Sequence, residues 1–227
     1  MADGAEPLLQ HASHPLWDWP TRLFHWSLVV LLPLAWWTAE EGQMDRHQWV
    51  GYTVIVLVLF RIVWGFVGSY HSRFRDFLRG PVTVLGYVRG RIAAGPGHNP
   101  LGAWSVVVLL SLLLVQAGSG LFNSDRILFD GPFYHAVDSD VRGFLGEVHE
   151  WAFNALLGMV ALHLLAIAWH QFGRREKLIQ AMVKGRAEGK SGQRAPAPWW
   201  LAPLVLVAVT ALCWWVLQQA PPPPRMW

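Results

Sequence analysis

The stretch EVHEWAFNALLGMVALHLLAIAWHQF, residues 147–172, decides the fold of this chain. Its apolar part is long enough to cross a bilayer as an α-helix, which takes about 20 residues. Within it, His149 and His163 stand 14 positions apart, and 14 helical steps return a side chain to within about 40° of the same face. The two imidazoles therefore share one face of a membrane-spanning helix, about 21 Å apart along its axis.

Four more apolar runs of similar length accompany this stretch. The five expected spans cover residues 23–39, 48–66, 101–122, 148–172 and 198–217. Of the 227 residues, 53% are apolar and only 15% are charged, whereas soluble domains carry about 25% charged residues. The composition excludes an ordinary soluble protein and, with these runs, predicts an all-α membrane protein with five transmembrane helices, the last of them C-terminal.

Charge alternates between the segments that connect the spans. The connections after the second and fourth spans are rich in Arg and Lys, and those after the first and third are rich in Asp and Glu. Because Lys and Arg favour the cytoplasmic side, we expect a cytoplasmic N-terminus and a periplasmic C-terminus in the inner membrane of a bacterium. The net charge of +3 then reflects orientation, and nothing supports nucleic-acid binding.

The same pattern divides the chain into four parts. Residues 1–22 are expected to form a cytoplasmic segment, since they are polar and do not resemble a signal peptide. Residues 23–172 form the helical bundle, and residues 173–197 form a basic cytoplasmic linker. Residues 198–227 hold the fifth helix and a Pro-rich outer tail.

The histidines inside the spans are the candidate functional residues, because ionisable side chains are costly there. Neutral imidazole is the usual axial ligand of b-type haem, and two such ligands favour electron transfer. His47 and His149 each begin a helix on the outer side, so they can hold an outer haem together. His25 and His163 lie near the inner side and can hold a second haem. The single cysteine excludes a C-x-x-C-H attachment, so both haem b groups would be non-covalent.

Three further residues qualify this assignment. His170 lies one heptad beyond His163 and is the alternative inner ligand, but it would place the irons about 31 Å apart. Arg61 follows His47 by 14 residues, at the expected depth of the inner haem. Its guanidinium either binds a haem propionate or reaches the inner interface. Arg22 is another candidate positive neighbour of a haem.

Three functions are compatible with these residues. The histidines can carry electrons through haem, or line a path for protons or a metal ion, or be incidental in a structural anchor of a redox complex. The sequence contains no G-x-G-x-x-G between a strand and a helix, so a catalytic head would be a separate polypeptide. Whether the chain is itself an enzyme, rather than an electron-transfer subunit, stays open.

Several segments around these residues resemble a known family, the prokaryotic cytochrome b-561 proteins and the b-type cytochrome subunit of nickel–iron hydrogenases. The resemblance covers about residues 15–185. It is carried by RLFHW (22–26), RHQWVGY (46–52), RIVWG (61–65), GHNPLG (97–102), EVHE (147–150) and LH (162–163).

The resemblance implies a four-helix bundle with two haem b groups that moves electrons between membrane quinol and a redox partner. It favours the four ligands His25, His47, His149 and His163 and spares His170. The implied partners are ubiquinone or menaquinone, a periplasmic cytochrome c or a catalytic oxidoreductase subunit, and membrane lipid. The fifth helix departs from the plain four-helix form and contains no histidine, so it should not bind haem.

Overall fold

The computed structural model describes residues 14–93, 97, 99–186, 192 and 194–222, and the regular structure in these ranges is helical. Residues 1–13 of the expected cytoplasmic segment, His98 of the GHNPLG motif, part of the basic linker and the end of the Pro-rich tail lie outside the described residues. The long helices are α1 (Trp19–Glu40), α2 (Met44–Val67), α5 (Pro100–Gly120), α6 (Ser139–Ala168) and α8 (Leu201–Leu217). The shorter helices are α3 (Phe74–Phe77), α4 (Pro81–Val88) and α7 (Leu178–Lys184), with turns η1 (Tyr70–Ser72), η2 (Tyr134–Ala136) and η3 (Trp169–Gly173). The all-α prediction is confirmed.

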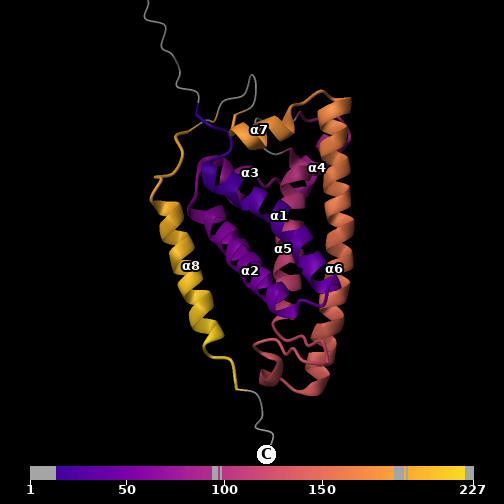
Figure 1. Cartoon of the computed structure of the whole chain (residues 1–227). Helices are drawn as coiled ribbons and strands as arrows, with labels where there is room; N and C mark the ends of the chain where they lie inside the picture. Colours follow the sequence, from indigo (N-terminus) through magenta and orange to yellow (C-terminus); the bar gives the residue numbers. More distant parts are fainter. Residues whose placement is uncertain (1–13, 94–96, 98, 187–191, 193, 223–227) are drawn as a thin grey trace, which may run out of the picture.

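The long helices run up and down beside one another (Figure 1). α6 packs along α5, α1 packs against α2, and α2 also contacts α5 and α8. The short helices α3, α4 and α7 gather at one end, and the connection between α5 and α6 closes the other (Figure 1). We call these the basic end and the acidic end, after the charges of their connecting segments.

Among the described residues, three helices are long and apolar enough to cross a membrane. They are Met44–Val67, Pro100–Gly120 and the combined helix Ser139–Gly173. Helix α1 has the length, at 22 residues, but is less apolar. Helix α8 is apolar but has 17 residues. Three of the five expected spans therefore meet both criteria, and membrane crossing by α1 and α8 stays a prediction.

Polar residues just before the helices set where they begin. Asp18 accepts a hydrogen bond from the Thr21 amide at 3.1 Å and caps α1, as expected for this residue type. Asp138 accepts from two amides in the first turn of α6, which begins at Ser139. The sequence placed the start of this span near residue 148 and His149 at the start of its helix. That placement was wrong, because the Asp138 cap starts the helix earlier and His149 lies inside it.

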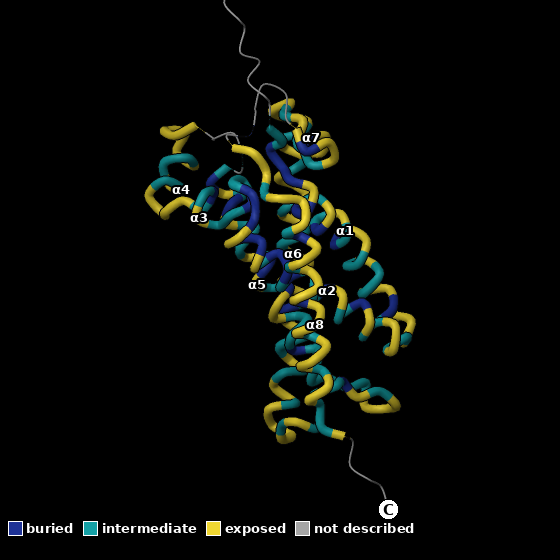
Figure 2. Tube along the Cα trace, turned by 90° about the vertical axis from the view of Figure 1, so that its left-hand side faces the viewer, coloured by how far each residue is buried: buried dark blue, intermediate teal, exposed yellow. Residues whose placement is uncertain are grey.

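Apolar side chains from four helices form one core between α1, α2, α5 and α6. Its buried members are Phe24, Leu28, Val50, Val54, Val58, Leu110, Leu113 and Leu156. Burial is concentrated on the facing sides of the helices, whereas the outward sides of α6 and α8 are largely exposed (Figure 2). Apolar side chains such as Leu165 and Trp151 are exposed on α6, which is the pattern of a helix that faces lipid.

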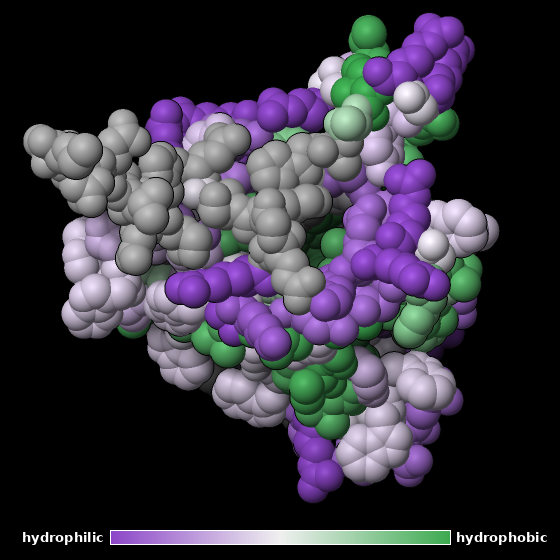
Figure 3. Space-filling view, turned by 90° about the horizontal axis from the view of Figure 1, so that it is seen from above, coloured by the Kyte–Doolittle hydropathy of each residue, from purple (hydrophilic) through white to green (hydrophobic). Residues whose placement is uncertain are grey.

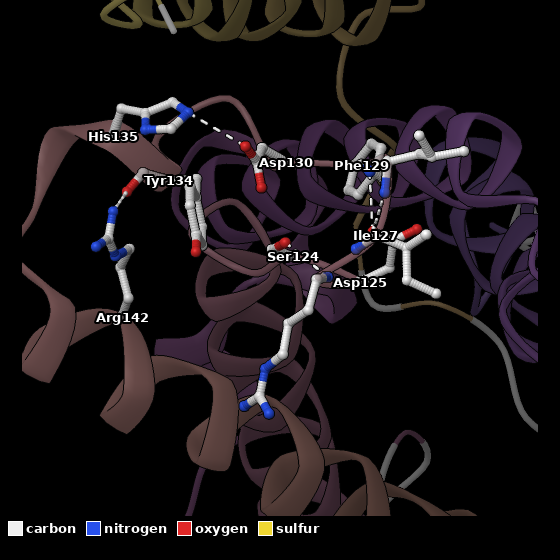
Figure 4. Close-up of polar contacts among 10 residues, drawn as sticks. Ser124, Asp125, Ile127, Phe129, Asp130, Tyr134, His135 and Arg142 are labelled. Atoms are coloured by element: carbon white, nitrogen blue, oxygen red, sulfur yellow. Dashed lines mark hydrogen bonds and ion pairs between the residues drawn. The ribbon is translucent and has the colours of Figure 1, made fainter. Parts of the chain in front are cut away.

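The segment between α5 and α6 is held by one carboxylate. Asp125 Oδ1 accepts hydrogen bonds from the amides of Ile127, Leu128 and Phe129 at 2.8, 2.9 and 2.9 Å (Figure 4). The amides of Phe129 and Ile127, in that order, hold the pKa of Asp125 below its ordinary value. This turn fixes the connection that leads into α6.

Candidate functional site

Two histidines from α2 and α6 face one another toward the acidic end. The ring centroids of His47 and His149 are 6.4 Å apart. His47 Nδ1 lies 2.9 Å from the carbonyl oxygen of Ala35, and His149 Nδ1 lies 2.8 Å from that of Gln116. A carbonyl oxygen can only accept, so each Nδ1 carries the proton and donates it. Each Nε2 then keeps its lone pair, which is the state that a metal ion requires.

A second pair lies nearer the basic end. The ring centroids of His25 on α1 and His163 on α6 are 6.5 Å apart. His25 Nδ1 is buried and has no hydrogen-bond partner among the described residues. An orphaned buried nitrogen is costly unless another group satisfies it. The structure thus brings together both pairs that the helical register predicts.

The spacing within each pair fits a haem iron between two axial imidazoles. With metal–nitrogen bonds of about 2.1 Å, the centroids of two opposed imidazoles lie about 6.5 Å apart. In the described residues, His, Cys, Asp and Glu side chains form no group of three or more that could hold a metal ion. The residues present fit two bis-histidine haem sites.

Apolar packing separates the two pairs. Leu156 lies midway between His149 and His163 on α6 and is buried in the core. Val58 of α2, in the same core, is fully buried. The helix is continuous between the two histidines, so the two levels are about 21 Å apart along its axis.

Residues of α5 surround His149 closely. The Gln116 side-chain nitrogen lies 3.1 Å from His149 Nε2, and Ser119 Oγ lies 3.4 Å from Nδ1. A Cβ atom at Gly120 would come within 2.9 Å of His149 Cε1. A metal bound at Nε2 would replace the Gln116 contact. The sequence analysis missed these neighbours, although Gln116 and Ser119 near the end of a mostly apolar helix were a usable signal.

Arg61 is buried near the basic end of the bundle. It is 2% exposed, and its Nη1 has no hydrogen-bond partner in the described part of the chain. Its guanidinium carbon lies 5.3 Å from the ring centroid of Phe74. The carboxylate of Asp18 interacts with it electrostatically and also accepts a hydrogen bond from Trp64 Nε1 at 2.9 Å. A buried guanidinium with a free N–H group suits a further anionic partner.

The other two candidate residues face α7 and its flank. His170 Nδ1 lies 3.3 Å from a carboxylate oxygen of Glu176, so the structure pairs it with this residue rather than with His25. Arg22 donates to the carbonyl oxygens of Met182 and Val183 at the end of α7. These contacts hold α7 against the bundle, and the haem-binding role expected for Arg22 stays a prediction.

An all-helical chain with membrane-length helices and two facing histidine pairs defines a class, the membrane b-type cytochromes. Within that class, the chain belongs to the prokaryotic cytochrome b561 family, which matches residues 16–185. The match spans α1 to α7 and ends before α8. Electron transport and haem b are the properties of this family.

Similar proteins include three described as probable Ni/Fe-hydrogenase B-type cytochrome subunits. The one from Azotobacter chroococcum is 26% identical over 81% of this chain and 92% of its own length. The one from Escherichia coli K12, a hydrogenase 1 subunit, is 24% identical over 80% of this chain and 93% of its own. The one from Bradyrhizobium diazoefficiens is 22% identical over 76% and 85%. No solved structure matches the chain.

Proposed function

We propose that the chain holds two non-covalent haem b groups and carries electrons through the membrane between them. The observation that carries this proposal is the two histidine pairs, His47 with His149 and His25 with His163, whose ring centroids are 6.4 and 6.5 Å apart. The continuous helix α6 supplies one histidine to each pair. Bound haem supplies one-electron chemistry at its iron. Each histidine pair would hold the iron of one haem through both imidazoles, and a haem held in this way would supply electron transfer rather than oxygen or substrate chemistry.

The chain's own residues orient the ligands. The carbonyl groups of Ala35 and Gln116 fix the rings of the outer pair and increase the basicity of Nε2 by accepting from Nδ1. For the inner pair, Arg61 is the residue we assign to a haem propionate. Its free Nη1 is buried, and Arg61 lies three residues before Trp64 on α2, about 4.5 Å along the helix axis.

The partners in this proposal follow from the relatives and from the charges of the chain. Since the relatives are described as hydrogenase cytochrome subunits, we propose that this chain passes electrons between a catalytic redox subunit and the quinone pool, either ubiquinone or menaquinone. A periplasmic cytochrome c, attracted by the acidic end, is the second candidate partner.

We also propose that the basic end faces the cytoplasm. Hydrophilic side chains gather across this end when it is seen from above (Figure 3), and its exposed cations include Arg75, Arg79, Arg89, Arg174 and Arg175. Lys and Arg in short loops favour the cytoplasmic side. A phosphatase reporter fused after residue 227 should then be active, because it would reach the periplasm, and an inactive reporter would reverse the orientation.

Replacement of single histidines tests the proposal. His163→Ala should remove one low-spin haem signal from the electron paramagnetic resonance spectrum and about half of the b-type absorbance. The matched variant His170→Ala should keep both, since this residue is paired with Glu176. The reverse result would move the inner ligand to His170. A wild-type protein with no reduced-minus-oxidised b-type spectrum would favour a transporter or an anchor instead.

A further inference from the structure

A shallow apolar groove lies at the basic end, between α4 and the first turns of α5. Pro81, Val84, Leu85 and Trp104 line it, its volume is about 470 Å³, and it is open along the surface of the molecule. We call it the α4 groove. The one polar group of its lining side chains, Trp104 Nε1–H, already donates to the carbonyl oxygen of Arg79 at 3.0 Å. The groove therefore suits a hydrocarbon chain.

Cations stand at both ends of α4. Arg75 and Arg79 precede the helix, and Arg89 and Arg91 follow it, all with exposed side chains. At its end, the Arg91 amide donates to the Gly86 carbonyl at 2.8 Å, which folds the chain back against the helix. α4 has eight residues, so the two groups of cations are about 12 Å apart along its axis.

The acidic side chain near α4 does not neutralise these cations. Asp76 is the one acidic residue between Arg73 and Ala93, and the structure pairs it with Arg73 at 2.5 Å. Its other oxygen is 3.8 Å from the exposed Arg75. Three exposed arginines, Arg79, Arg89 and Arg91, thus flank the helix that lines the apolar groove, and no acidic residue of this segment is paired with them.

The helix between these cations has the surface of an interfacial element. Val82 and Val88 are 83% and 60% exposed, which is unfavourable in water for a helix this short. Trp104 is part-exposed beside them, and indole rings with one wet edge favour the membrane interface. Apolar side chains between arginines are the pattern of a helix that lies in the headgroup region.

We propose that the α4 groove and its arginines form a binding site for an anionic phospholipid of the membrane. One acyl chain occupies the groove beside Trp104, and the positive charge of Arg79, Arg89 and Arg91 at the two ends of α4 attracts the negative headgroup. A neutral lipid fills the groove with an acyl chain but leaves the cations without an anionic partner. A soluble anion pairs with the cations but leaves the apolar groove unfilled. An amphiphile with a negative headgroup matches both.

Lipid retention by the full-length, haem-loaded protein tests this proposal. Native mass spectrometry would compare phosphatidylglycerol with phosphatidylcholine of identical acyl chains, titrated into delipidated protein in detergent. Because each cation near a lipid surface contributes to anionic-lipid binding, the variant R79Q/R89Q/R91Q should lose about tenfold or more of its phosphatidylglycerol affinity. R174Q/R175Q/K184Q removes three exposed cations from the same end, away from the groove, and should keep that affinity.

A second pair of variants tests the groove itself. Val84→Phe fills the lining and should weaken phosphatidylglycerol retention severalfold, whereas Val82→Phe, at an exposed position outside the lining, should not. Equal retention of the two lipids by the wild type would overturn the proposal. So would equal loss in both arginine variants, or displacement of the bound phosphatidylglycerol by a water-soluble quinone analogue. The b-type spectrum, measured on every variant, reports whether each one is folded.

Discussion

At the level of single residues, the packing of α5 against His149 is close. Its ring is held from two sides by α5, where Gln116 contacts both ring nitrogens and Gly120 leaves no room for a side chain. The orientation of the His149 imidazole is thus determined by the position of α5 along α6. Such neighbours, which orient a ligand without touching the metal, commonly tune metal affinity as strongly as tenfold or more.

Gly120→Ala should damage the outer site selectively. The added methyl group would stand 2.9 Å from His149 Cε1, too close for ordinary contact, so the ring must turn or the helices must part. We expect a loss of about 1–3 kcal/mol of stability and a change in the low-spin signal of the outer haem alone. Electron paramagnetic resonance and thermal unfolding measure the two effects.

Gly118→Ala is the matched control, because a Cβ atom there would meet nothing within 4 Å. This variant should keep both haem signals and lose no stability, since alanine favours helix over glycine. Identical spectra for the two glycine variants would show that the α5 contact does not orient His149.

At the level of elements, the turn that leads into α6 depends on ionised Asp125. Three amides donate to its carboxylate, and its pKa lies below the ordinary value in the folded protein. Its stabilising effect is therefore complete above the ordinary carboxyl pKa and is lost as the pH falls through the lowered folded value. Hydrogen exchange at residues 127–129 should accelerate, relative to the intrinsic rate, as the protein is acidified.

Asp125→Asn should remove this pH dependence and give faster exchange at neutral pH. Asp45→Asn changes an exposed carboxylate in the first turn of α2 and serves as the control, with exchange in the turn unchanged. Protection of residues 127–129 that persists in Asp125→Asn at neutral pH contradicts the role of the carboxylate.

Helix α8 should contribute to stability and not to haem binding. It contains no histidine, and it contacts α2 through a small buried cluster of Phe60, Trp64 and Ala202. Ala202 is 2% exposed, so Ala202→Trp should force α8 away and cost about 1–3 kcal/mol by overpacking. Thermal unfolding and haem content measure the two properties.

Val207→Trp is the control on the same helix, at a position that is 66% exposed. Both variants should retain two haem groups, and only Ala202→Trp should lower the melting temperature. Loss of haem from Ala202→Trp in the folded state would mean that α8 supports a haem site through α2.

At the level of the whole molecule, periodicity was enough to predict that the chain is helical and that His149 and His163 share one helix face. A separation of 14 residues between His149 and His163 aligns two side chains on any regular helix, so the pairing could be deduced without coordinates. The start of α6 could not be deduced from the sequence, because Asp138 caps the helix before the apolar run begins. Contacts across helices, such as Trp64 with Asp18, depend on how the helices cross, which a single sequence does not state.

The number of haem groups per chain tests the central claim most directly. Pyridine haemochrome analysis of the purified wild-type protein, set against an amino-acid determination of its concentration, should give two b-type haems per chain. Each should be low-spin, because two imidazoles flank each site. A ratio of one haem per chain would mean that one of the two histidine pairs holds no haem, which contradicts the two-site assignment. A ratio of zero would contradict the electron-transfer function.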